Sequence, residues 1–126
     1  MQHPYFLIVT AIGEVGIGVP LLVAPALPLR LLHNINSASQ ETTFVARVAG
    51  AALLGIGVAS WLARNDRYTP ALRGLLIGLL VYDFVVAGLL VNAALASNMA
   101  GVALWPGVHL VLGAWGVACL RTARSD

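Results

Sequence analysis

Four ionisable side chains within long apolar stretches of the sequence are the residues best placed to do chemistry. Glu14, Arg47, Asp83 and His109 occur one in each of four such stretches. An ionisable group inside a membrane span costs at least about 2.5–3.5 kcal/mol near the span's centre, so it usually faces a partner in the bundle interior. Carboxylate, imidazole and guanidinium groups held there can relay protons or bind a polar ligand. These four residues therefore form the candidate site for binding or proton relay.

The stretches that carry these residues are long enough to cross a membrane, because a helix needs about 20 apolar residues to do so. The chain of 126 residues is 60% hydrophobic and 10% charged, against roughly 45–50% and about 25% in soluble domains. We predict an all-α integral membrane four-helix bundle with up-down-up-down topology and a single transmembrane domain over residues 1–126. The predicted spans are Pro4–Ala24, Thr42–Ala63, Ala71–Leu95 and Val102–Leu120.

Prolines and capping residues mark the ends of these spans. Pro20 predicts a kink or an early stop near the end of the first span. The segment Leu27–His33 is predicted to be a short amphipathic turn at the membrane surface. Ser39 followed by Thr42, or Glu41 in the first turn, supplies a helix start for the second span. Pro70 is predicted to begin the third.

The distribution of arginine predicts the orientation of the chain, since short cytoplasmic loops are enriched in Lys and Arg. All seven basic residues are arginine. One side of the predicted bundle has only Arg30 and the partly immersed Arg47. Both termini are therefore predicted to be cytoplasmic, in a bacterial inner membrane. The arginines on the predicted cytoplasmic side are Arg64, Arg67, Arg73, Arg121 and Arg124.

Helical periodicity places each ionisable residue on a face rich in small side chains, and such residues let membrane helices approach closely. We therefore expect the four charged faces to be the packed faces. The expected faces are Glu14 with Thr10, Ala11 and Gly18; Arg47 with Gly50, Leu54 and Gly57; Asp83 with Ala87, Leu90 and Ala94; and His109 with Pro106, Gly113 and Gly116. Small residues four apart also mark expected contacts at Ala46/Gly50, Ala51/Gly55, Gly55/Ala59 and Gly74/Gly78.

The expected network assigns a role to each member. Arg47 would be the counter-charge for Asp83 and Glu14, and His109 would be the group that changes charge near neutral pH. Tyr82 and Asn92 are two further candidates. The alternative is purely structural, because the same charges can neutralise one another and fix the register of the helices.

The sequence specifies no catalytic residue, metal site or cofactor. A quinone or a b-type haem would be compatible with a membrane bundle. A b-type haem requires two axial ligands at the same depth in the membrane, and no second histidine lies at the depth of His109. The same shortage of ligands argues against zinc. A net charge of +2 carried by arginines near span ends indicates membrane orientation, so we predict no nucleic-acid partner.

The Ala-Arg-Val-Ala-Gly segment at residues 46–50, within a small four-span chain, resembles the bacterial membrane proteins called DoxX-like. That resemblance implies a cytoplasmic-membrane protein, sometimes attached to quinone-linked redox chemistry. A redox cysteine pair is absent, because Cys119 is the only cysteine of the chain.

Three functional readings follow from these observations. The first is a non-catalytic membrane protein that binds a small apolar or lipid-like ligand, or a partner subunit, at its polar cluster. The second is a membrane subunit of a quinone-linked oxidoreductase, with His109 and Asp83 exchanging protons with the quinone. The third is a small proton-coupled transporter acting as a dimer, since four spans enclose little volume.

Overall fold

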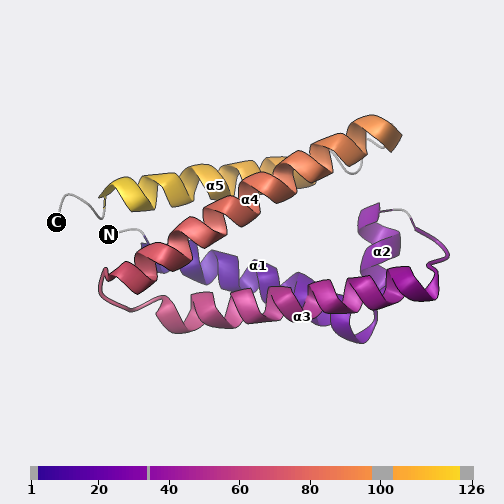
Figure 1. Ribbon diagram of the computed structural model, residues 1–126, viewed down its shortest axis with the longest axis horizontal. Coiled ribbons are helices and arrows are strands. Elements are labelled where there is room, and N and C mark those ends of the chain that lie inside the picture. The colour runs from indigo at the N-terminus through magenta and orange to yellow at the C-terminus, as the bar shows by residue number, and fades with distance from the viewer. Residues whose placement is uncertain (1–2, 34, 98–103, 123–126) are drawn as a thin grey trace. The chain divides into compact units, whose positions relative to one another are not determined.

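The computed structural model describes residues 3–33, 35–97 and 104–122, and every regular element within them is a helix. The five helices are α1 (His3–Val23), α2 (Ala26–His33), α3 (Gln40–Ala63), α4 (Pro70–Ser97) and α5 (Leu104–Thr122), shown in Figure 1. The prediction of an all-α chain is confirmed. The predicted spans differ from the observed helices by no more than about one turn at any described end.

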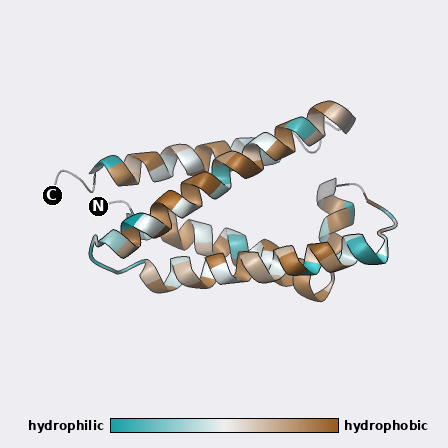
Figure 2. Ribbon diagram, in the orientation of Figure 1, coloured by the Kyte–Doolittle hydropathy of each residue, from teal (hydrophilic) through white to brown (hydrophobic). Residues whose placement is uncertain are grey.

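Among the described residues, four helices are long and apolar enough to cross a membrane: α1, α3, α4 and α5. Their residues are largely hydrophobic along the helix, whereas the loop between α3 and α4 is hydrophilic (Figure 2). Large apolar side chains such as Leu62, Leu89 and Val111 are exposed on these helices. Water would penalise that exposure and lipid does not, so the chain is a multi-pass membrane protein.

Hydroxyl caps begin two of the spans where the sequence indicated. The Thr42 N–H donates to Ser39 Oγ at 3.2 Å, so Ser39 satisfies one of the free N–H groups at the start of α3. The Leu72 N–H donates to Thr69 Oγ1 at 3.2 Å, and Pro70 then occupies the first position of α4, where its missing N–H costs nothing.

The first span ends within one residue of its prediction, and of the two effects expected of Pro20 the early stop is not observed. Pro20 does not stop α1, which continues to Val23. The Ala24 N–H donates to the Pro20 carbonyl at 2.8 Å, which completes the last turn. Pro25 then disfavours helical geometry at the residue before it. The predicted short segment is present as the eight-residue helix α2.

The chain divides into two compact units, each described by itself: residues 7–62 form one, and residues 1–6 with 63–126 form the other. In the first unit, α1 and α3 approach so closely that glycine is required. A Cβ on Gly50 would lie 2.7 Å from the Gly18 carbonyl oxygen and 2.7 Å from the Leu22 nitrogen. Gly57 lies against Val15 and Ala11. Since Gly57 faces residues earlier in α1 than Gly50 does, the two helices are antiparallel.

In the second unit, α4 and α5 lie side by side (Figure 1). The Phe84 ring lies over Gly113, and the Leu80 side chain lies over Gly116. This order means that α4 and α5 are also antiparallel. Glycine at these two positions of α5 leaves room for large α4 side chains and draws the two backbones together.

The small-residue pairs were only partly correct as indicators of packing. Ala46 and Gly50 are buried as expected. The other three pairs lie on exposed faces, and an added Cβ on Gly55, Gly74 or Gly78 would meet no described heavy atom within 4 Å. Spacing alone marks a surface that permits contact, but a neighbouring helix must also be present.

Candidate functional site

The centre of the candidate site is a direct contact between α4 and α5. His109 Nδ1 lies 2.8 Å from Asp83 Oδ1, which is hydrogen-bonding distance. An ionised carboxylate at Asp83 accepts from the ring N–H, and a bond of that kind is charge-assisted, a class roughly twice as strong as neutral hydrogen bonds. The structure therefore brings together two of the four ionisable residues singled out from the sequence.

The local structure explains why this contact forms. His109 shares its face of α5 with Pro106, Gly113 and Gly116, and all three of these residues are buried. The two glycines leave space on α5 that the Phe84 and Leu80 side chains of α4 fill. In this packing an imidazole extending from α5 can reach a carboxylate on α4. The sequence pattern thus acts through packing to place the polar pair.

The two members of the pair differ in accessibility. The Asp83 side chain keeps 4% of its surface exposed and the His109 side chain keeps 15%. The Asp83 carboxylate is thus enclosed, whereas part of the imidazole is open to a molecule beside the helices. Because Asp83 engages Nδ1, the second ring nitrogen, Nε2, is directed away from the carboxylate.

The Tyr82 ring packs edge-to-face against the His109 ring. Its ring and that of His109 are 5.7 Å apart between centroids, with an interplanar angle of 78°. Edge-to-face rings at this separation attract one another and limit each other's rotation. Asn92 lies nine residues after Asp83 on α4, which turns it to the opposite side of the helix, and it is exposed.

Glu14 belongs to the other unit and is buried on α1, with 7% of its surface exposed. Its predicted face is confirmed, because Thr10, Ala11 and Gly18 are buried too. A carboxylate on the packed face of an apolar helix fits the expectation that ionisable groups turn away from lipid.

The structure differs from the expectation at Arg47, which is exposed on α3 although Gly50 and Gly57 on its predicted face are buried. The contact between Gly18 and Gly50 places Arg47 level with Leu21, two turns or about 10 Å along the axis from Glu14. Arginine can carry its charge along a flexible stem toward the membrane surface, so an arginine near a span end does not need an interior partner. The network of all four residues remains a prediction.

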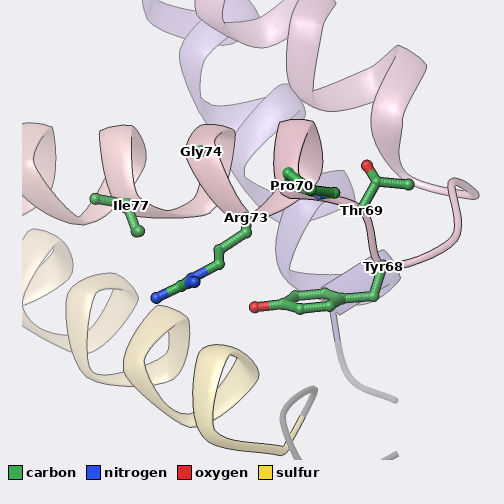
Figure 3. Close-up of a pocket in the computed structure, with 6 residues that line it drawn as sticks. All are labelled: Tyr68, Thr69, Pro70, Arg73, Gly74 and Ile77. Carbon is green, nitrogen blue, oxygen red and sulfur yellow. The ribbon is translucent and has the colours of Figure 1, made fainter.

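Sequence reasoning missed a hollow of about 430 Å³ at the end of α4 where the helix begins (Figure 3). A smaller hollow of about 170 Å³ shares Tyr68, Arg73 and Ile77 with it and extends to α5. The arginines here were interpreted only as orientation signals. The residue that could have drawn attention is Tyr68, an amphipathic side chain between charged residues at a span end.

No metal centre is indicated within the described ranges, where no group of three or more His, Cys, Asp or Glu side chains could hold an ion. Cys119 is buried and free. Comparison of the chain with protein-family models, with curated proteins and with solved structures gives no match.

Proposed function

We propose that this protein is a non-catalytic membrane protein of the bacterial inner membrane that binds a small lipid-soluble molecule carrying a hydroxyl or carbonyl group. The proposed binding group is the Asp83–His109 pair. The observation that carries the proposal is the 2.8 Å contact between Asp83 Oδ1 on α4 and His109 Nδ1 on α5, two apolar helices that are long enough to cross a membrane.

The chemistry of the pair favours a ligand with a polar head and an apolar body. With Asp83 accepting from Nδ1–H, Nε2 of a neutral ring accepts a hydrogen bond from a hydroxyl group. Nε2–H of a protonated ring donates to a carbonyl. Asp83 fixes the orientation of the ring, as carboxylates do for other functional histidines. The surrounding lipid supplies ligands whose apolar part needs no enclosed pocket.

The exposed part of the imidazole supports this assignment. A pair that served only to neutralise charge would function equally well with both members enclosed. His109 instead keeps 15% of its side-chain surface accessible, and the Tyr82 ring borders it. A flat or ring-shaped head group can therefore approach beside an aromatic side chain, where stacking adds to hydrogen bonding.

The proposal also covers the membrane orientation, the family and the partners of the protein. Both termini lie in the cytoplasm by the arginine distribution, and the chain is grouped with the DoxX-like proteins on its Ala46–Gly50 segment and its four spans. A homo-oligomer or a partner membrane subunit would cover part of the large apolar surface that the described helices expose.

The test is the recovery of lipid-soluble molecules with the purified protein. Wild-type protein and the variants His109→Leu and Asp83→Asn are purified in mild detergent, extracted with organic solvent, and the extracts are quantified by mass spectrometry per mole of protein. Asn92→Leu on the opposite side of α4 is the matched control.

We expect one class of molecule to co-purify with wild type and with the control. His109→Leu removes the hydrogen bond to the ligand, which costs about 0.5–1.5 kcal/mol for a neutral ring and about 1.5–3 kcal/mol for a charged one, so recovery of the molecule should fall by up to about tenfold or more. Asp83→Asn removes the carboxylate that orients the ring, so recovery should fall in that variant too. Equal recovery from all four proteins, with folding intact, would exclude the pair as a ligand site.

A quinone-linked oxidoreductase subunit is the second candidate function, and the same geometry favours it. Nε2 can bond either the carbonyl of a quinone or the hydroxyl of a quinol, so one pair serves both forms of the head group. Recovery of a quinone as the co-purifying molecule would select this function. Proton flux into liposomes that is lost in Asp83→Asn would instead select the proton-coupled transporter.

A further inference from the structure

A second candidate site, separate from the Asp83–His109 pair, lies where the loop between α3 and α4 meets α5. The two adjoining hollows there have volumes of about 430 and 170 Å³. They lie at the ends of two spans, since α4 begins at Pro70 and α5 ends at Thr122. This is the depth at which lipid head groups meet a membrane helix.

The polar groups that line these hollows are basic or neutral. Arg73 on α4 and Arg121 on α5 bring guanidinium groups from two different helices. Tyr68 lines both hollows. Figure 3 shows the Tyr68 ring extending from the loop before α4, and the Arg73 side chain extending from α4, toward α5. The residues that line the two hollows include no Asp or Glu.

The Tyr68 hydroxyl is the second observation that points to a ligand. Its oxygen is buried, and it has no hydrogen-bond partner among the residues that the structure describes. A buried hydroxyl without a partner is unfavourable, because it has lost its hydrogen bonds to water. An acceptor placed in the adjoining hollow would satisfy this group and neutralise the arginines at the same time.

The apolar side chains define the rest of the ligand. Ile77, Val117 and Leu120 supply apolar side chains to the lining of the hollows. Charged donors at the span ends with an apolar wall beside them match a molecule with an anionic head and hydrocarbon chains. Basic pockets between membrane helices on the cytoplasmic side bind such head groups, and arginine binds phosphate through two parallel hydrogen bonds.

We propose that this hollow binds the phosphate of an anionic phospholipid. Arg73 and Arg121 bind the phosphate oxygens, the Tyr68 hydroxyl donates to one of them, and an acyl chain lies along Ile77, Val117 and Leu120. The site holds a structural or regulatory lipid of the surrounding bilayer. It is independent of whichever molecule binds at His109.

The experiment is native mass spectrometry of the whole chain in detergent, with phosphatidylglycerol as the probe and phosphatidylcholine as the zwitterionic comparison. The variants are Tyr68→Phe, Arg73→Gln and Arg121→Gln. Arg67→Gln is the matched control, because Arg67 is an exposed arginine of the same loop that lines neither hollow.

We expect phosphatidylglycerol to bind wild type more tightly than phosphatidylcholine does. Each arginine variant should weaken that binding by about tenfold, because it removes a charged group that can make two hydrogen bonds to the phosphate. Tyr68→Phe should weaken it by a smaller factor, because it removes a single hydrogen bond. Arg67→Gln should have the smallest effect. Tyr68→Phe removes a single oxygen and retains the ring, so it also tests the site if an arginine variant fails to fold.

Two results would overturn the proposal. Equal affinity for the two lipids, or an Arg67→Gln effect as large as that of Arg73→Gln, would mean that general surface charge attracts the lipid. Complete competition by inorganic phosphate would assign the site to a free anion instead. Persistence of lipid binding when phosphate is added supports the head group as the occupant.

Discussion

Simultaneous replacement of Asp83 and His109 by leucine should cost less stability than the two single replacements together. Each single replacement leaves one buried polar group without its partner, whereas the double variant places two apolar side chains in contact. Breaking a buried ion pair in a soluble protein costs about 3–5 kcal/mol, but that value does not carry over to a membrane.

The membrane changes the reference state. Separated helices remain in lipid, so the Asp83 side chain stays in an apolar solvent even when the bundle is disassembled. Coupling energies between polar groups in membrane proteins therefore average only about 0.6 kcal/mol, with a maximum near 1.7. The Asp83–His109 bond is 2.8 Å long and its carboxylate is nearly fully enclosed, which places it toward the upper end. We expect a coupling energy of about 1–1.7 kcal/mol.

The assay is equilibrium unfolding in mixed micelles, or steric trapping in a bilayer, for wild type, both single variants and the double variant. A second cycle that couples Asn92→Leu with His109→Leu is the control, because Asn92 is exposed on the opposite side of α4 from Asp83. Independent sites add to within about 0.3–0.5 kcal/mol. A coupling no larger than that for Asp83 and His109 would refute the contact as a stabilising interaction.

Two further predictions concern packing and orientation. Gly50→Ala places a Cβ 2.7 Å from backbone atoms of α1 and should destabilise the protein by about 1–3 kcal/mol in the same unfolding assay. Gly55→Ala is the control and should not destabilise it, because no described heavy atom lies within 4 Å of the added Cβ. Equal effects of the two variants would contradict the close approach of α1 and α3. In a cysteine-free background, Asn65→Cys should react with a membrane-impermeant thiol reagent only from the cytoplasmic side, and Ser37→Cys only from the opposite side. Labelling of both cysteines from the same side of the membrane would contradict the predicted topology.

The spans could be predicted from the sequence because hydrophobic length and capping chemistry are local properties. Ser39, Thr69 and Pro70 act on the backbone within a few residues, so their effect does not depend on which helices become neighbours. Pro20 was harder to interpret, since a proline in the last turn removes an N–H bond without ending the helix.

The pairing within the candidate site was only partly predictable. Helical periodicity correctly placed Glu14, Asp83 and His109 on small-residue faces, but it does not specify which face meets which. Arg47 was therefore predicted to be the counter-charge of Asp83, whereas the structure places His109 beside that carboxylate. Contact between α4 and α5 depends on Gly113 and Gly116 accepting Phe84 and Leu80, a three-dimensional fit that spacing does not encode.

The hollow lined by Tyr68, Arg73 and Arg121 could not be predicted at all from local pattern. Its lining comes from a loop and two helices that are about 50 residues apart at their extremes. Arginine counts at span ends carry information on orientation, and the same residues acquire a possible binding role only when the fold brings them together around a tyrosine.

The central claim, that the carboxylate of α4 touches the imidazole of α5 within the bilayer, can be measured directly by solid-state NMR in lipid membranes. With ¹³C-labelled aspartate and ¹⁵N-labelled histidine, we predict strong dipolar coupling between the Asp83 carboxyl carbon and His109 Nδ1, lost in Asp83→Leu. Absence of that coupling in folded wild-type protein would contradict the account.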